Sequence, residues 1–140
     1  MANPNFIFQL SWLRMGLFYV GCKVTNPRTA KSVVVPKMLV DTGAESTWID
    51  SQVLTKAGIE PRKKDLQFQM ANGQIITRPV GYAILNVDKA ETVDEVVFAQ
   101  KGNLQLLGAH TLEGLCRFQV RRITSFQIEA YVDLQQLLSV

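Results

Sequence analysis

The chain has 140 residues, of which 47% are apolar and 19% are charged, and its formal net charge is +3. These values predict one globular domain with a substantial core and exclude an intrinsically disordered chain. The small positive charge gives no reason to expect nucleic acid or an acidic membrane as a partner.

Residues 1–14 are predicted to form an N-terminal extension. The apolar run from Phe6 to Leu13 is too short to span a bilayer, and no Lys or Arg precedes it. Tyr19 to Cys22 faintly matches a lipoprotein cleavage site, but the residues before Gly21 are bulky and a strand pattern continues through them. We therefore expect neither secretion nor a membrane anchor.

The next residues predict two strands joined by a turn. Apolar residues alternate with other residues from Gly16 to Val24, which indicates a strand. Asn26 to Thr29 is a turn signal, and Ser32 to Val40 is the returning strand. Pro36 within that strand predicts an edge or a bulge, because proline cannot donate a ladder hydrogen bond.

The returning strand ends in Met38-Leu39-Val40-Asp41-Thr42-Gly43-Ala44. Consecutive apolar residues are typical of a strand that is buried on both faces. A carboxylate at the end of such a strand is only partly solvated, so its pKa can be tuned. The Thr42 hydroxyl can hydrogen-bond inside a crowded site, and Gly43 permits a tight turn. Taken alone, Asp-Thr-Gly favours an ordinary Asp-initiated turn between two strands.

The middle of the chain predicts a short helix and then more strands. Asp50 or Ser51 can cap the helix, and Gly58 with Pro61 can end it. Asn72-Gly73 is a strong signal for a two-residue hairpin turn within residues 67–80. Two further strands are expected over 82–87 and 93–99, joined by a polar loop over 88–91.

A second apolar run, Leu104 to Leu107, ends in Gly108 and is followed by a helix-like segment. Beyond it, Arg117, Arg121 and Arg122 indicate a solvated face. Residues 126–133 alternate like a strand, and the leucines after them suggest a helical end.

These two segments resemble the retropepsin-like (clan AA) aspartic proteases of the single-domain bacterial type. In that family an apolar-apolar-Asp-Thr-Gly-Ala strand and turn supplies the catalytic carboxylate, matched here by Leu39 to Ala44. An apolar-apolar-Gly segment packs beside it and leads into a helix, matched by Leu106 to Gly108 and Thr111 to Glu113. The resemblance covers about Met15 to Leu115. It implies a mostly β fold: a closed retropepsin-like β-barrel half with a flap hairpin and one or two short helices.

The resemblance also implies a domain organisation. Related domains often begin near a Met-Gly pair such as Met15-Gly16, which leaves residues 1–14 as an extension. Residues 15–125 would then form the protease domain. Residues 126–140 would form a C-terminal tail, which can belong to the dimer interface because terminal strands commonly hold dimers together in this family.

The implied activity is that of an aspartic endopeptidase without cofactor or metal. Two carboxylates a few Å apart can share one proton, so that one acts as base toward water and the other as acid. This chain contains a single Asp-Thr-Gly. The second carboxylate should therefore be Asp41 of another copy, which entails a symmetric homodimer acting on an extended peptide or protein substrate.

The resemblance assigns roles to the residues around Asp41. Thr42 would bond across the interface, Gly43 would present its carbonyl to substrate, and Ala44 would line the site. Glu45 takes the place of an acidic residue that contacts substrate backbone in viral members. Leu107 and Gly108 would support the site. The flap over the peptide would consist of Met70, Ala71, Asn72, Gly73, Gln74 and Ile75.

One departure from the family pattern supports a rival interpretation. Viral members carry Arg directly after the second glycine, where this chain has Ala109, so an ion pair between that Arg and Glu45 is missing. A weaker interface would leave the two aspartates apart. The alternative is therefore a non-catalytic peptide-binding or assembly module on the same fold.

Other classes of site find little support. His110 is the only histidine, which argues against a His-rich metal site or a catalytic triad and indicates a helix-capping or packing residue. Neither GxGxxG nor GxxxxGK[ST] occurs. Cys22 and Cys116 are too few for a disulfide framework and lack CxxC spacing. We expect buried free thiols and a reducing, cytoplasmic compartment.

Overall fold

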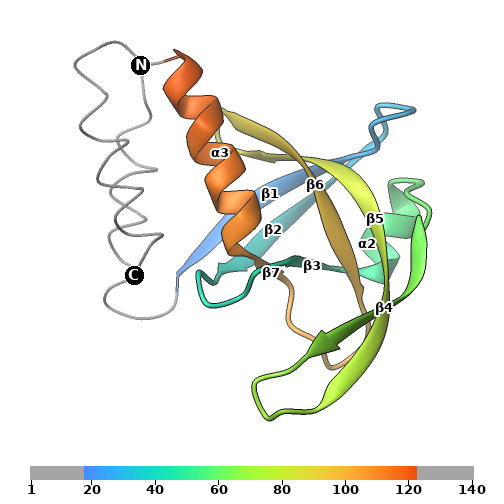
Figure 1. Cartoon of the computed structure of the whole chain (residues 1–140). Coiled ribbons are helices and arrows are strands. Elements are labelled where there is room, and N and C mark those ends of the chain that lie inside the picture. The colour runs from blue at the N-terminus through green and yellow to red at the C-terminus, as the bar shows by residue number, and fades with distance from the viewer. Residues whose placement is uncertain (1–17, 123–140) are drawn as a thin grey trace.

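The computed structural model describes residues 18–122, which form a seven-stranded sheet and two helices. The strands lie in the order β1-β2-β7-β3-β6-β5-β4, and β1 also pairs with β5. The sheet therefore closes into a ring, with β4 attached outside it along β5 (Figure 1). This ringed sheet confirms the predicted mostly β, retropepsin-like fold class. In chain order the elements are β1 (Tyr19–Thr25), β2 (Ser32–Val40), β3 (Thr47–Asp50), α2 (Ser51–Lys56), β4 (Lys63–Gln69), β5 (Ile75–Val87), β6 (Ala90–Ala99), β7 (Leu106–Leu107) and α3 (Ala109–Arg122).

The β1–β2 hairpin carries the bulge that the proline predicted. The pairing register shifts at this point, so that Pro36 and Lys37 together face Gly21. A bulge suits proline because the extra residue makes no ladder hydrogen bond. The predicted turn after Asn26 is also confirmed, since β1 ends at Thr25 and β2 begins at Ser32.

Helix α2 begins and ends at residues that the sequence indicated. Asp50 Oδ1 accepts a hydrogen bond from the Gln52 N–H at 2.8 Å, which caps the first turn. Gly58 adopts a φ of +73° just after the helix, a conformation that favours glycine. Asn26 Nδ2 donates to the carbonyl oxygens of Ala57 and Gly58 at 3.1 and 2.9 Å, which ties the β1–β2 turn to this helix end.

The β4–β5 hairpin forms where Asn72-Gly73 predicted it, but its turn differs from the prediction. The Gly73 N–H donates to the Met70 carbonyl at 2.9 Å, and the Met70 N–H donates to the Gln74 carbonyl at 2.7 Å. The turn is therefore centred on Ala71 and Asn72, with Gly73 next at a φ of +85°. The predicted two-residue Asn-Gly turn is wrong, because it needs a positive φ at Asn72 as well.

The connection between β5 and β6 is shorter than the predicted loop over 88–91. Ala90 already pairs with the last residue of β5, so only Asp88 and Lys89 form the turn. Asp88 has a φ of +56°, which aspartate tolerates better than most residues. Strand β6 consequently begins before the predicted Val93.

Two apolar clusters share the strands that lead to the candidate site. The main cluster includes Met38, Val40 and Leu107, whereas their neighbours Leu39 and Leu106 belong to the second. The consecutive apolar residues of β2 and β7 are thus explained by burial on both faces. We call the second one the flap-side cluster; its buried members are Leu39, Trp48, Val80, Val97, Ala99 and Leu106.

Helix α3 completes the main cluster. It packs mainly against β6 and contributes Leu112, Leu115 and Cys116 to that cluster (Figure 1). Cys116 and Cys22 are both buried and free, as predicted. No helix in the described part of the chain is long and apolar enough to cross a membrane.

Three predictions lie outside the described residues. They are the N-terminal extension over 1–14, the first residues of the strand predicted from Gly16, and the C-terminal tail over 126–140. The boundaries of the predicted domain over 15–125 therefore remain predictions.

Candidate active site

Asp41 lies in a tight turn directly after β2. Its Oδ1 accepts a hydrogen bond from the Gly43 N–H at 2.9 Å, and its carbonyl oxygen accepts one from the Ala44 N–H at 3.3 Å. Asp41 and Thr42 are half-buried, whereas Gly43 is exposed. The turn therefore holds the carboxylate through one oxygen in a place that solvent and ligands can reach.

Strand β7 holds this turn from the side. It lies between β2, to which it is parallel, and β3, to which it is antiparallel. The Asp41 N–H donates to the Leu107 carbonyl at 3.0 Å, and the Ala109 N–H donates to the Ala44 carbonyl at 2.7 Å. Two backbone bonds thus attach both ends of the turn to one short segment far away in the sequence. The two apolar segments that the sequence paired do lie together.

Gly108 allows the close approach of these two segments. A Cβ added at this position would meet the Ser46 carbonyl oxygen and, at 2.8 Å, the Glu45 carbonyl oxygen. Both neighbours are backbone atoms, which cannot rotate away as a side chain can. Gly108 is therefore required by packing, and its φ is not in the left-handed region.

The β4–β5 hairpin extends on the side of the flap-side cluster. Ala44 from the turn at Asp41–Ala44 and Met70 from the hairpin both pack against that cluster, and Phe68 contacts Trp48 edge-on with ring centroids 5.1 Å apart. The hairpin tip projects beyond the rest of the sheet (Figure 1), and Ile75 is 63% exposed on it. The flap-side cluster therefore connects the base of the hairpin to the turn that carries Asp41.

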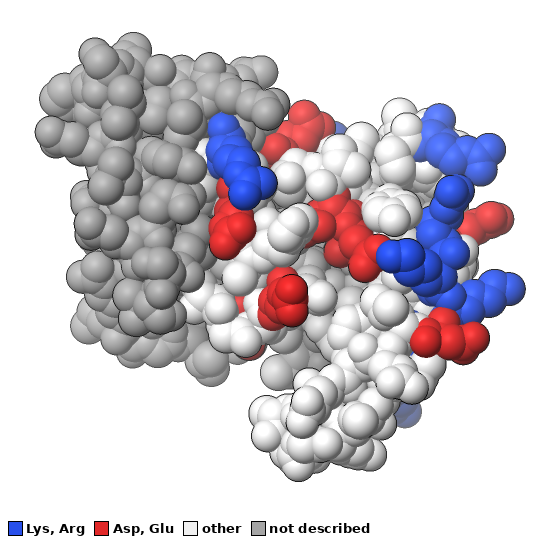
Figure 2. All heavy atoms as spheres, in the orientation of Figure 1, with Lys and Arg blue, Asp and Glu red and all other residues white. Residues whose placement is uncertain are grey.

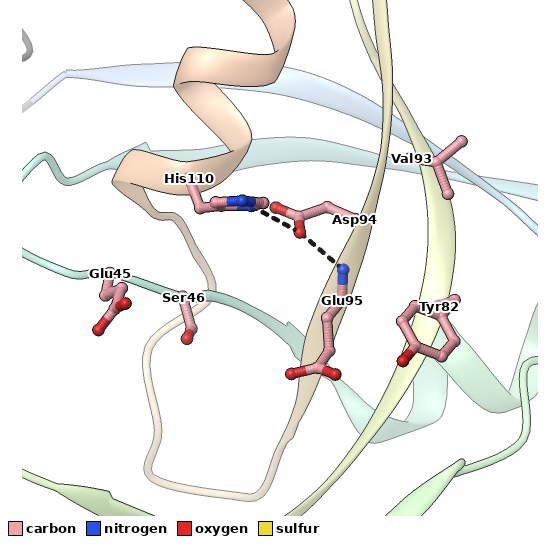
Figure 3. A pocket seen from close by; sticks show the side chains of 7 residues that line it. All are labelled: Glu45, Ser46, Tyr82, Val93, Asp94, Glu95 and His110. Atoms are coloured by element: carbon pink, nitrogen blue, oxygen red, sulfur yellow. Dashed lines mark hydrogen bonds and ion pairs between the residues drawn. The ribbon is translucent and has the colours of Figure 1, made fainter.

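A pocket of about 510 Å³ opens beside Glu45 and Ser46, which directly follow the turn at Asp41. Glu45 and Ser46 line one side and Tyr82 the opposite side, while Asp94 and His110 face each other between them (Figure 3). Acidic side chains gather over α3 and β6 on this face, and basic ones lie toward β4 (Figure 2). The complete lining is Glu45, Ser46, Tyr82, Val93, Asp94, Glu95 and His110.

Asp94 is a buried carboxylate with a full set of partners. Its side chain is 8% exposed. Oδ1 accepts the Glu95 N–H at 2.7 Å and lies 2.9 Å from His110 Nδ1, while Oδ2 accepts the Thr111 hydroxyl at 2.7 Å. Burial of a carboxylate is tolerated only with such compensation. Asp94 therefore joins β6 to the beginning of α3.

His110 does not have the role that the sequence suggested. Its side chain is 65% exposed in the first turn of α3 and pairs with Asp94, so the interpretation as a packing or capping histidine is wrong. The hydrogen bond to Asp94 raises the pKa of His110, and the charge of Asp94 adds to this increase. His110 is consequently protonated over a wider pH range than a free histidine.

The structure brings some predicted site residues together and separates others. Asp41 to Ala44 form one hydrogen-bonded unit with Leu107 and Gly108, whereas Glu45 lines the adjacent pocket. Of the predicted flap residues, Met70 packs against the flap-side cluster, as Ala44 does from the turn. Within residues 18–122, no three His, Cys, Asp or Glu side chains are grouped as metal ligands would be.

Sequence reasoning missed the polar residues behind the turn. Thr47, Thr111 and Asp94 are buried in a common hydrogen-bonded group. The signal that was available is a pair of carboxylates, Asp94 and Glu95, between the valines of a predicted strand, Val93-Asp94-Glu95-Val96-Val97. Its partners are far apart in the sequence, so the spacing of residues could not reveal them.

Comparison with known families agrees with this geometry. A family model described as "gag-polyprotein putative aspartyl protease" matches residues 33–114, a segment that includes the turn at Asp41, the β4–β5 hairpin, β7 and the beginning of α3. No curated protein matches the chain significantly.

Proposed function

Because the chain belongs to the gag-polyprotein aspartyl protease family, we propose that it is an aspartic endopeptidase that works as a homodimer. Asp41 from each of two copies would face the other across a two-fold axis. One carboxylate would take a proton from water as the water attacks the peptide carbonyl. The other would donate its proton to the substrate, so that the pair titrates as a unit.

The observation that carries this proposal is how Asp41 is held. Its carboxylate is bonded at Oδ1 by the turn itself, and its backbone is bonded by β7, so it is fixed without being fully buried. A catalytic acid or base needs such a fixed position together with access to substrate. The sequence holds one Asp-Thr-Gly, and two carboxylates are needed. A second copy of the chain is the simplest source of the other.

The β4–β5 hairpin supports an extended peptide as the substrate. Its tip carries exposed backbone and the exposed Ile75, and its base packs against the flap-side cluster, which Ala44 of the turn also contacts. Extended peptides bind by adding backbone hydrogen bonds to such an edge, while apolar pockets select their side chains. Closure of this hairpin over the peptide would also exclude water from the site.

Cleavage of a diverse peptide library by the full-length chain tests the proposal. Wild type would be compared with Asp41→Asn, and with Asp88→Asn as a matched control because Asp88 is exposed in the β5–β6 turn, outside the hairpin, and asparagine tolerates its φ of +56°. We expect cuts with wild type and Asp88→Asn, none with Asp41→Asn, and a specific activity that rises with protein concentration as dimers form. Retained cleavage by Asp41→Asn would overturn the proposal. Peptide binding without turnover in wild type would instead favour a non-catalytic peptide-binding module.

A further inference from the structure

A buried chain of hydrogen bonds runs from the backbone beside the catalytic turn toward the pocket. The Gly108 N–H donates to Thr47 Oγ1 at 2.9 Å, and the Oγ1 atoms of Thr47 and Thr111 are 2.5 Å apart. Thr111 Oγ1 in turn donates to Asp94 Oδ2 at 2.7 Å. Both threonines are fully buried, so water cannot replace a missing partner. This chain of hydrogen bonds connects β3, α3 and β6.

The two end groups, the Gly108 N–H and the Asp94 carboxylate, determine which group donates in each of these hydrogen bonds. A backbone N–H can only donate, and an ionised carboxylate can only accept. Thr111 uses its single hydroxyl proton toward Asp94, so it must accept the proton of Thr47. The oxygen of Thr47 is then the acceptor for Gly108. Each group therefore depends on the acceptor at the end, which is Asp94.

His110 and the backbone of Glu95 both approach the other oxygen of that terminal acceptor. His110 Nδ1 lies 2.9 Å from Asp94 Oδ1, and the Glu95 N–H donates to the same oxygen at 2.7 Å. These partners leave Oδ2 for Thr111 alone. The chain thus begins at a carboxylate on the pocket side and ends at a backbone N–H beside the catalytic turn.

The end at Gly108 matters because β7 is short. Its two residues, Leu106 and Leu107, have few ladder bonds of their own, yet the Leu107 carbonyl is the acceptor for the Asp41 N–H. The hydrogen bond from the Gly108 N–H to Thr47 Oγ1 fixes Gly108, which is the residue directly after β7. A shift of β7 would move the acceptor that holds Asp41, and shifts of about 1 Å in a catalytic group can cost roughly 100-fold in rate.

We propose that Thr47 and Asp94 are positioning residues for Asp41: through Thr111 they fix Gly108 and so keep β7 where it holds the catalytic turn. The catalytic part of this inference rests on the proposed function. The structural part, that the hydrogen-bond chain fixes β7 and the turn, does not. The two parts can be measured separately.

The kinetic test compares Thr47→Val, which removes the hydroxyl at nearly constant shape, with Thr47→Ser, which keeps it. We expect Thr47→Val to lower kcat by about tenfold or more with KM within about twofold, because the orientation of Asp41 is lost while the hairpin proposed to bind the peptide is unchanged. Thr47→Ser should restore most of the rate. Val24→Ala, a cavity variant at a fully buried position of β1, controls for lost stability and should keep kcat while it is folded.

The structural test measures amide hydrogen exchange by NMR and needs no cleavage. In Thr47→Val the amides of Gly108 and Asp41 should exchange about tenfold faster or more, relative to the amides of β1. Asp94→Asn should have the same effect. An asparagine amide that donates to Thr111 would reverse the hydrogen bonds through Thr111 and Thr47, which leaves one buried hydroxyl proton without an acceptor.

The results separate the two hypotheses. The inference would be overturned if Thr47→Val had the same amide exchange rates and the same kcat as wild type. Equal losses of kcat in Thr47→Val and Thr47→Ser would overturn it too. If wild type cleaves no peptide but exchange at Gly108 and Asp41 accelerates as expected, the hydrogen-bond chain does fix the turn and only the assignment of catalysis fails.

Discussion

Replacing Gly108 by alanine tests whether the turn that carries Asp41 depends on its close backbone contact. The added Cβ would overlap the Ser46 carbonyl oxygen and lie 2.8 Å from the Glu45 carbonyl oxygen. Neither atom can move without moving the turn, since Glu45 and Ser46 follow it directly in the chain. The substitution therefore acts on the position of Asp41 as well as on stability.

The size of the effect follows from two opposing contributions. Overpacking in a filled core costs about 1–3 kcal/mol, and contact with two backbone groups places Gly108→Ala near the upper end. Alanine also recovers up to about 1 kcal/mol, because glycine loses more backbone entropy on folding. The net loss in the free energy of unfolding should be about 2 kcal/mol, which for a chain of 140 residues lowers Tm by roughly 7 °C.

Thermal unfolding followed by circular dichroism measures this loss, and peptide cleavage at a temperature where the variant is folded measures the displacement of Asp41. Gly21→Ala is the matched control, because its added Cβ would lie 3.5 Å from the Pro36 carbonyl oxygen, an ordinary contact. It should raise the free energy of unfolding by up to about 1 kcal/mol, because the entropy gain is not offset by a clash. Equal Tm values for the two variants would refute the packing argument for Gly108.

Two further properties should be measurable without substrate. Hydrogen bonding to Asp94 raises the pKa of His110, so the protonated imidazole stabilises the fold below about pH 6.5, and this stabilisation is lost as the pH rises through the folded-state value. Urea unfolding of wild type and His110→Asn at several pH values measures this stabilisation. Because His110 is 65% exposed, we expect the free energies of unfolding to differ by less than about 1 kcal/mol at acidic pH. A difference that is the same at acidic and alkaline pH would contradict this. Burial raises the pKa of Cys22 and Cys116 to about 12, so a thiol reagent should label them far more slowly in native protein than in urea, and rapid native labelling would show that they are accessible.

Local chemistry made much of the fold predictable. Asp50 and Gly58 delimit α2 through a cap and a left-handed residue, which involve only neighbouring residues. Pro36 located a bulge because its missing N–H has the same effect in any strand. The Asn72-Gly73 signal identified a hairpin but not its turn type, since Gly73 can be used at a bulge as readily as in a two-residue turn.

The polar residues behind the site could not be predicted in the same way. Thr47 and Thr111 are far apart in the sequence, and a threonine in a strand or helix is ordinary. Only the closed sheet brings them next to Asp94. The apolar-Gly pattern at Leu107 and Gly108, by contrast, matches a family motif, and the family resemblance paired it with the turn at Asp41. The polar residues behind the turn belong to no such motif and were missed.

The arrangement separates the requirements for folding from those for catalysis. The ring is closed by pairing of β1 with β5 in the same chain, and both apolar clusters are built from one copy. The position of Asp41 is likewise fixed by bonds within one copy. The proposed mechanism, however, needs a second carboxylate, which a second copy would supply. Under the proposed mechanism, dilution should therefore abolish cleavage before it unfolds the chain. Each copy folds and holds its own Asp41, and only cleavage requires that two copies associate.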